Sequence, residues 1–232
     1  MSLLELDGVE TYYGESHILE GVDLEVEEGE VVALMGRNGV GKTTTLRSIL
    51  QLTSPREGSI RYRGKELVGM ETHEVADAGV GWIPEDRRMF SQLTVEENVR
   101  IAVPKDADVQ EGLDLAWDAF PDLEEIRDRD AGDLSGGQQQ MLAIARGLVG
   151  KNDLLLVDEP SEGLAPLIVE NVHDALEKAA GETTILLVEQ NLPMALDLAD
   201  RFYVLDHGVV VDSGDADEVS TDSERLRRHL SA

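Results

Sequence analysis

Short apolar runs and longer segments with helical spacing follow one another along the chain. Three runs consist of consecutive apolar residues: Val31–Met35, Leu154–Val157 and Ile185–Val188. A strand that is covered on both faces has this pattern, because both rows of its alternating side chains are buried. The three runs therefore predict buried strands.

Segments near these runs have apolar residues three or four positions apart, which predicts helices at 44–52, 106–120, 139–149 and 166–180. Thr94 and Glu97 form a capping box, which predicts that another helix begins there. Alternation over residues 60–63 predicts a strand. Together these elements predict an α/β fold.

The length and composition bound the possibilities further. With 232 residues, the chain suits one large domain, because single cores stop growing near ~250 residues. No apolar run approaches the ~18 residues that cross a bilayer, and the N-terminal residues show no signal-peptide pattern. The absence of cysteine excludes disulfides, zinc-thiolate sites and thiol nucleophiles. We expect a single cytoplasmic domain over residues 1–232.

The net charge of −28 is unusual, since ordinary small domains carry about 2 to 8 charges. It argues against nucleic acid as a partner, because binding phosphates requires cations. Dispersed carboxylates with only five lysines resemble the surfaces of halophilic proteins, in which salt screens the repulsion. Ordinary acidic solubility is the alternative explanation. Residues 31–60 depart from the trend with four basic groups and one acid, which indicates an anionic ligand.

That basic stretch contains a glycine-rich loop between a predicted strand and a predicted helix. The loop is Gly36-Arg-Asn-Gly-Val-Gly-Lys-Thr43. Glycines permit a tight wrap with inward N–H groups, and the helix N-terminus adds positive potential. Lys42 supplies a mobile charge for the outer phosphates, and the Thr43 hydroxyl is placed to ligate Mg²⁺. The loop predicts binding of a nucleoside triphosphate.

An acidic pair, Asp158 and Glu159, ends the second apolar run. A carboxylate at the carboxyl end of a strand beside a phosphate loop can hold Mg²⁺, and Asp158 fits this role. Glu159 is placed to orient the attacking water or accept its proton. Acidic residues often end strands, so the pair alone is a weak signal. Together with the phosphate loop it becomes a strong one.

A third motif, Leu134-Ser-Gly-Gly-Gln138, precedes the helical pattern of 139–149. Ser135 and Gln138 alone could be an ordinary capping box. Two glycines in a first helical turn cost up to ~1 kcal/mol each relative to alanine, and they let an anion approach the backbone. The motif therefore predicts a second phosphate-binding helix end.

In this order and spacing, GRNGVGKT (36–43), LSGGQ (134–138) and LLLVDEP (154–160) resemble the motifs of ATP-binding cassette (ABC) ATPases. The likeness runs from about residue 4 to residue 212. It implies a P-loop NTPase core resembling RecA, with an N-terminal antiparallel β lobe, formed by 1–85 and 151–232. A helical subdomain that carries the LSGGQ signature would be inserted at about 86–150.

The resemblance also implies roles for individual residues. Nucleotide contacts fall on Tyr13, Gly36, Asn38, Gly39, Gly41, Lys42, Thr43 and Thr44. Mg²⁺ ligands fall on Thr43, Glu85 and Asp158. Contacts to ATP bound by the opposite protomer fall on Ser135, Gly136, Gly137 and Gln138. Tyr13 is favoured to stack on adenine, and Tyr12 is the alternative, because strand alternation lets only one of them face the base.

Two positions depart from the common family pattern. Glu85 stands where most members have glutamine, and Gln190 stands where a histidine commonly touches the γ-phosphate. Glutamine donates a hydrogen bond but takes up no proton at neutral pH. Catalysis is therefore assigned to Glu159, with Lys42 and Gln190 in support.

The detailed wording of the motifs, including LSGGQQQ and LLVEQN, is similar to one ATPase subunit of branched-chain amino acid importers, where Glu85 and Gln190 are typical. This resemblance implies a peripheral ATPase on the cytoplasmic face of the membrane. The expected partners are membrane permease subunits, a second ABC ATPase in a heterodimer (or a copy of itself), and indirectly an extracytoplasmic solute-binding protein.

Several alternatives remain open. Urea or short-amide importers have similar motifs. A soluble ABC ATPase would usually show a coiled-coil insertion or fused cassettes, and a phosphotransferase of another P-loop class would lack LSGGQ. A nucleotide-gated interaction module without hydrolysis is the other reading, because of Gln190.

Overall fold

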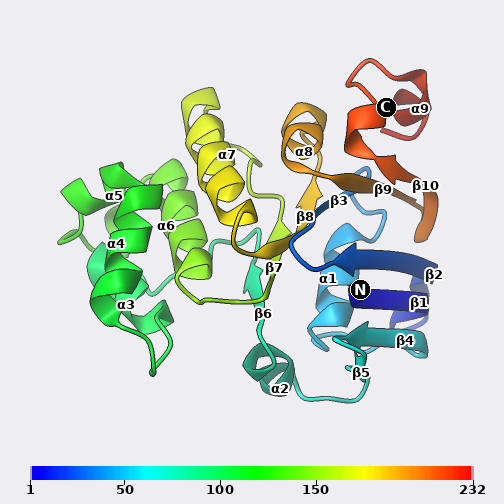
Figure 1. The fold of residues 1–232 in the computed structure, drawn as a ribbon, viewed down its shortest axis with the longest axis horizontal. Helices are drawn as coiled ribbons and strands as arrows, with labels where there is room; N and C mark the ends of the chain where they lie inside the picture. Colours follow the sequence, from blue (N-terminus) through cyan, green and yellow to red (C-terminus); the bar gives the residue numbers. More distant parts are fainter. Residues whose placement is uncertain (1, 231–232) are drawn as a thin grey trace.

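The computed structural model describes residues 2–230, which form two sheets and surrounding helices (Figure 1). The central sheet has the strand order β10-β9-β3-β8-β7-β6. Five of its strands are parallel, and β10 pairs antiparallel to β9. The strands are β3 (Val31–Met35), β6 (Val80–Ile83), β7 (Leu154–Asp158), β8 (Thr184–Glu189), β9 (Arg201–Asp206) and β10 (Val209–Asp215). All three apolar runs are buried strands, as predicted.

The second sheet is antiparallel, with the order β2-β1-β4-β5. Its strands are β1 (Ser2–Tyr13), β2 (Ser16–Glu27), β4 (Glu57–Tyr62) and β5 (Lys65–Glu66). The strand predicted at 60–63 lies within β4, but Arg63 belongs to the following turn, with a φ of 50°. The expected α/β fold with an antiparallel β lobe is confirmed.

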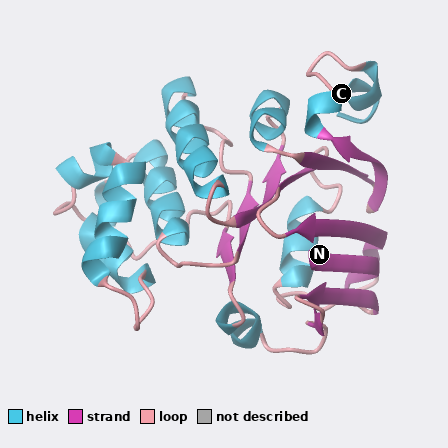
Figure 2. Cartoon of the chain, viewed as in Figure 1, coloured by secondary structure: helices cyan, strands magenta, loops and turns pink. Residues whose placement is uncertain are grey.

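A group of helices lies between β6 and β7 in the sequence and packs to one side of the central sheet, away from the β lobe (Figure 2). It consists of α3 (Val95–Ala102), α4 (Val109–Ala119), α5 (Pro121–Glu125), the 3₁₀ turn η1 (Ala131–Asp133) and α6 (Gly136–Leu148). The other helical elements are α1 (Lys42–Ile49), α2 (Thr72–Asp77), α7 (Pro166–Ala180), α8 (Leu192–Leu198), η2 (Ala216–Glu218) and α9 (Glu224–Leu230).

Capping chemistry sets several helix starts. Thr94 and Glu97 form the predicted capping box at the start of α3. The helix predicted over 106–120 begins three residues later than expected, because Asp108 is its N-cap and accepts a hydrogen bond from the Gln110 amide at 2.7 Å. Helix α7 has the predicted bounds, and α1 begins two residues earlier than predicted.

Side chains from the two faces of the central sheet enter different parts of the core. In β3, Val32 and Leu34 pack with the β lobe and α1. Val31 packs with α7 and with the helices that lie between β6 and β7 in the sequence, while Ala33 and Met35 pack with α8 and α9. This alternation explains why every residue of β3 is buried, since both faces of the strand are covered.

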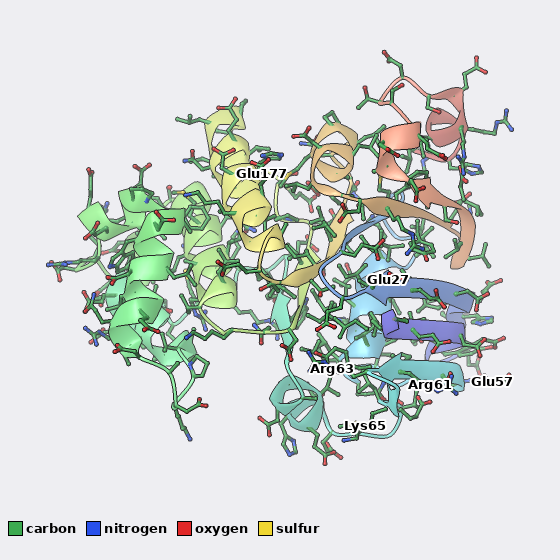
Figure 3. The ribbon with its side chains drawn as sticks, viewed as in Figure 1. Glu27, Glu57, Arg61, Arg63, Lys65 and Glu177 are labelled. Atoms are coloured by element: carbon green, nitrogen blue, oxygen red, sulfur yellow. The ribbon has the colours of Figure 1, made fainter. Side chains whose placement is uncertain are left out.

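Acidic side chains far outnumber the basic side chains that could pair with them. Arg61, Arg63 and Lys65 gather on β4, β5 and their turn (Figure 3), and Arg63 pairs with Asp153 at 3.1 Å. The chain has 48 acidic but only 20 basic residues, so many carboxylates have no lysine or arginine of their own.

The helices within residues 2–230 include no candidate for a membrane-spanning segment.

The excess of carboxylates predicts that salt stabilises the fold. The Debye length shrinks from ~10 Å at 0.1 M salt to ~3 Å at 1 M, which screens repulsion among exposed carboxylates. We expect the urea midpoint of unfolding to rise between 0.05 M and 2 M KCl. Because urea is uncharged, it does not alter the ionic strength, which the KCl concentration alone sets. Sucrose at equal osmolality is the control and should raise the midpoint less; a midpoint insensitive to KCl would contradict the prediction.

Candidate functional site

The site lies where parallel strands of the central sheet end. Strands β3, β8 and β7 are neighbours and run in the same direction. Their carboxyl ends therefore lie at one edge of the sheet, as in other open α/β folds. The glycine-rich loop follows β3, Glu159 follows β7, and Gln190 follows β8. Segments separated by more than 100 residues are brought together in this way.

A cavity of about 390 Å³ opens at this edge. Nine of the residues predicted to act in the site line it: Tyr13, Asn38, Gly39, Gly41, Lys42, Thr43, Thr44, Glu85 and Glu159. Ile18 and Glu162 also line it and were not predicted. Asp158 and Gln190 are connected to it through hydrogen bonds to Thr43 and Glu159.

Lys42 is a cation that lines the cavity, and it is almost fully buried. Its Nζ donates to the carbonyl oxygens of Gly36 and Arg37, both at 2.9 Å. The same ammonium lies 3.1 Å from Oε1 of Glu159, whose side chain is also buried. The ammonium is therefore fixed between the backbone of the glycine-rich loop and Glu159, and it can donate charge-assisted hydrogen bonds to an anion in the cavity.

Two glycines of the loop are required by space as well as by conformation. Gly41 has a φ of 115°, and a Cβ there would lie 2.7 Å from Leu19. A Cβ on Gly36 would lie 2.4 Å from the carbonyl oxygen of Leu205. The loop thus packs directly against the strand β2 and the end of β9, which fixes its position over the cavity.

Asp158 is buried at the end of β7 and is suited to a cation. Its Oδ1 accepts a hydrogen bond from the Thr43 hydroxyl at 3.1 Å. Its Oδ2 is buried and has no hydrogen-bond partner among residues 2–230. Burial raises the pKa of Asp158 to about 6, although the Thr43 hydroxyl lowers it. An unpartnered carboxylate oxygen beside a hydroxyl fits a hard divalent cation, which prefers oxygen ligands.

Glu159 lies between Lys42 and Gln190. The side-chain amide of Gln190 donates to Oε2 of Glu159, opposite the oxygen that faces Lys42. The backbone of Glu159 has a φ of 45°, which is unusual for a residue other than glycine. Its N–H donates to the carbonyl of Val188 at 2.8 Å, which stabilises this conformation. Such strain is common where a side chain must be presented in one orientation.

The two candidate adenine platforms differ in their surroundings. The Tyr13 ring lines the cavity and is 42% exposed, with its hydroxyl near Arg47 and Thr53. Tyr12 is stacked on His17 at 4.1 Å between ring centres. The Arg56 guanidinium also lies 4.2 Å from the centre of the Tyr12 ring. Tyr13, the preferred candidate, is therefore the tyrosine whose ring faces the cavity.

The signature motif begins α6. Ser135 and Gln138 form a complete capping box, with hydrogen bonds of 3.3 Å and 3.0 Å. The glycines also have a packing reason, which the sequence did not show. A Cβ on Gly136 would lie 2.9 Å from the Arg87 guanidinium, and one on Gly137 would lie 3.0 Å from Ile168. None of the described residues that line the cavity belongs to the signature.

Several polar residues at the site were not among the predicted site residues. Glu162 lines the cavity, and its pKa is raised, first by its interaction with Glu159 and then by burial. Glu189 is 1% exposed, and burial raises its pKa to about 7 despite hydrogen bonds from Ser161 and Gln190. Arg87 donates to Gln140 of α6 at 2.9 Å. Sequence spacing carries no signal for these contacts except that Glu189 ends an apolar run.

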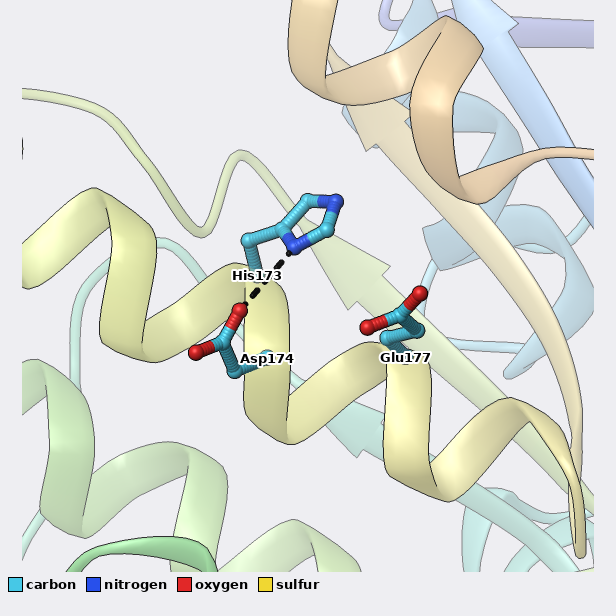
Figure 4. A group of neighbouring side chains, drawn as sticks. All are labelled: His173, Asp174 and Glu177. Atoms are coloured by element: carbon cyan, nitrogen blue, oxygen red, sulfur yellow. Dashed lines mark hydrogen bonds and ion pairs between the residues drawn. The ribbon is translucent and has the colours of Figure 1, made fainter.

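A second group of potential metal ligands lies on α7 (Figure 4). Ligand atoms of His173, Asp174 and Glu177 lie within 4.8 Å of one another. The His173 ring is already 2.7 Å from Asp197 and 3.4 Å from Asp174. The adjoining cavity, of about 710 Å³, is larger than the one at the phosphate loop, but none of its described lining residues is a predicted site residue. We assign no metal to this exposed acidic surface.

Comparison with known proteins decides the family. Residues 19–162 match the family model described as ABC transporter. The chain belongs to the ABC transporter family. Members of this family hydrolyse ATP to drive transport, so the chain is an ATPase.

Two relatives are similar over most of the chain. One is the high-affinity branched-chain amino acid transport ATP-binding protein BraG of Pseudomonas aeruginosa, 46% identical over 90% of this chain and 91% of its own. Another is the probable branched-chain amino acid transport ATP-binding protein LivF of Archaeoglobus fulgidus, 40% identical over 89% of both chains.

A more distant relative and a solved structure extend the comparison. BraF of Pseudomonas aeruginosa, also a branched-chain amino acid transport ATP-binding protein, is 28% identical over 98% of this chain and 97% of its own. The crystal structure of an ATP-binding cassette of an ABC transporter in its ADP conformation superimposes with a TM-score of 0.83. It is 26% identical, and all of both chains is covered.

The position of Glu159 predicts the effect of Glu159→Gln. The variant keeps the size of the side chain but removes the carboxylate, so ATP turnover should fall by roughly 10²- to 10⁴-fold. Nucleotide affinity should stay near that of the wild type, because the phosphate loop is intact. Steady-state turnover and calorimetry measure the two. Glu177→Gln is the control for loss of one charge, since Glu177 is exposed on α7; retained hydrolysis in Glu159→Gln would refute the assignment.

Proposed function

We propose that this chain is the ATP-hydrolysing subunit of an importer for branched-chain amino acids. The observation that carries the proposal is the 46% identity with BraG over nine-tenths of both chains. LivF at 40% identity has the same named solute class. Glu85 lies in the cavity and Gln190 contacts Glu159. The two departures from the common family pattern thus have places at the site, which supports an active enzyme over an inactive interaction module.

In the proposed mechanism, residues of the chain bind and orient ATP and prepare the attacking water. Tyr13 stacks on the base, and the amides of Gly36–Thr44 and Lys42 hold the phosphates. Glu159 accepts the proton of the water, and Gln190 fixes the orientation of the Glu159 carboxylate through their hydrogen bond. Thr43, Asp158 and Glu85 would hold Mg²⁺, which neutralises phosphate charge.

The proposed site is completed by a second chain. Residues 86–150 form the proposed helical subdomain, and its signature lies outside the cavity that contains Lys42. We expect Ser135–Gln138 of one protomer to close over ATP held by the other. Pseudomonas aeruginosa has two different ATP-binding proteins named for branched-chain amino acid transport, BraG and BraF, which supports a heterodimer.

The proposed complex is peripheral to the membrane on its cytoplasmic face. Membrane permease subunits would contact the chain, and an extracytoplasmic solute-binding protein would act on it indirectly. The dispersed negative charge, −28 in total, supports a halophilic source with high salt inside the cell. Urea or short amides are the competing solutes, and neither is named in the BraG or LivF descriptions.

Solute-stimulated ATPase activity tests the proposed transport role. The complex is recovered from native membranes in mild detergent at high salt and reconstituted with its binding protein. Leucine, isoleucine or valine should stimulate ATP turnover severalfold, while urea should not. The same complex with Lys42→Ala is the control and should show no stimulation. Stimulation by urea alone, or recovery without any membrane protein, would contradict the proposal.

ATP-dependent association tests the shared site. Glu159→Gln with ATP and Mg²⁺ should shift toward a dimer, alone or mixed with its companion ATPase, because bound ATP persists between the two chains. Size-exclusion chromatography with light scattering measures the shift. Lys42→Ala is the matched control and should remain monomeric. Absence of any ATP-dependent association with either partner would count against a shared site.

A further inference from the structure

The last residue of β8, Glu189, is a buried carboxyl group to which the sequence analysis assigned no role. Only 1% of it is exposed. Its Oε1 accepts a hydrogen bond from the Ser161 hydroxyl, and its Oε2 accepts one from the backbone N–H of Gln190 at 3.1 Å. One side chain therefore connects the loop after β7 with the loop after β8.

These two loops carry Glu159 and Gln190, whose side chains are hydrogen-bonded to each other. Glu159 precedes Ser161 by two residues, and Gln190 directly follows Glu189. The Gln190 side chain donates to Oε2 of Glu159, and the Glu159 N–H donates to Val188 at 2.8 Å. The hydrogen bonds and the chain segments between them form a closed ring, with Glu189 at its buried side.

Packing alone does not account for a carboxyl group at this position. The four residues before Glu189 in β8, Ile185–Val188, are apolar and buried. Another apolar side chain would continue this pattern, whereas burial of a carboxyl group is costly unless it is fully hydrogen-bonded. The Ser161 and Gln190 hydrogen bonds meet that requirement, and both lead back to Glu159.

We propose that Glu189 is a positioning residue for ATP hydrolysis, which holds Gln190 against Glu159. Glu189 acts through its two hydrogen bonds and is not among the described residues that line the cavity. The proposal rests on the catalytic role proposed for Glu159 and deepens it. Rotation of Gln190 away from Glu159 would leave one carboxylate oxygen without its donor and the orientation of the group unset.

The chemistry of the two hydrogen bonds provides a matched pair of variants. In Glu189→Gln, the amide oxygen can accept from the Gln190 N–H while the amide nitrogen donates to the Ser161 oxygen, since a hydroxyl both donates and accepts. Glu189→Leu removes both hydrogen bonds but keeps a side chain of similar volume. A positioning role therefore tolerates glutamine but not leucine, whereas a role that needs the negative charge tolerates neither.

Steady-state kinetics of the reconstituted complex test the proposal. Glu189→Leu should lower kcat roughly ten- to a hundredfold, as expected for a misplaced catalytic group. The KM for ATP and the nucleotide affinity should change little, because the phosphate loop is untouched. Glu189→Gln should keep kcat near the wild-type value. Wild-type turnover in Glu189→Leu, or an equal loss in both variants, would overturn the proposal.

A double-mutant cycle asks whether Glu189 acts through Gln190. Glu189→Leu and Gln190→Ala should be non-additive, with the double variant no slower than the slower single variant. Losses that multiply would show an independent role and overturn the proposal. Should Glu189→Leu lose nucleotide binding through misfolding, Ser161→Ala cuts one of the two links. It should lower kcat with KM unchanged, while Ser161→Thr, which keeps the hydroxyl, should not; equal turnover in both would overturn the proposal.

The outcomes separate this proposal from the one on which it rests. Retained hydrolysis in Glu159→Gln refutes the role of Glu159, whatever the Glu189 variants do. An inactive Glu159→Gln together with a fully active Glu189→Leu refutes only the positioning role.

Discussion

The buried ion pair between Lys42 and Glu159 connects the two halves of the site. The ammonium and the carboxylate lie 3.1 Å apart, and both side chains are almost entirely shielded from water. Removing one member of a buried pair typically costs about 3–5 kcal/mol, because the other charge is left uncompensated. The pair ties the loop after β3 to the loop after β7, and two backbone carbonyls also hold the Lys42 ammonium. The other polar groups of the cavity are arranged around this link.

Electrostatics explain why this small region differs from the rest of the surface. Glu85, Glu159 and Glu162 line the same cavity, and Asp158 is buried beside it. Repulsion from Glu159 and Glu85 contributes to the raised pKa of Asp158, after the larger effect of burial. The basic residues of 31–60 and a divalent cation are the groups that can offset this negative charge. On the acidic exterior, salt in solution screens the repulsion among exposed carboxylates.

The start of α6 meets two structural requirements, capping and close packing, in four residues. The capping box satisfies the helix terminus within one chain, and the glycines make room for Arg87 and Ile168. Arg87 also donates to Gln140 and to the Glu162 carbonyl at 3.2 Å. The signature helix is therefore held by the same loops that carry Glu85 and Glu159, so its position depends on theirs.

The sequence by itself determined the features that depend on neighbouring residues. The buried strands, the glycine loop before α1, the acidic end of β7 and the capping boxes can be recognised from residue types only a few positions apart in the sequence. Only the tertiary structure decided which tyrosine faces the cavity and which buried acid meets Ser161. Those outcomes depend on contacts between segments that are distant in the chain, such as the 28 positions between Ser161 and Glu189, and strand order brings such segments together. Residue spacing does not encode that order.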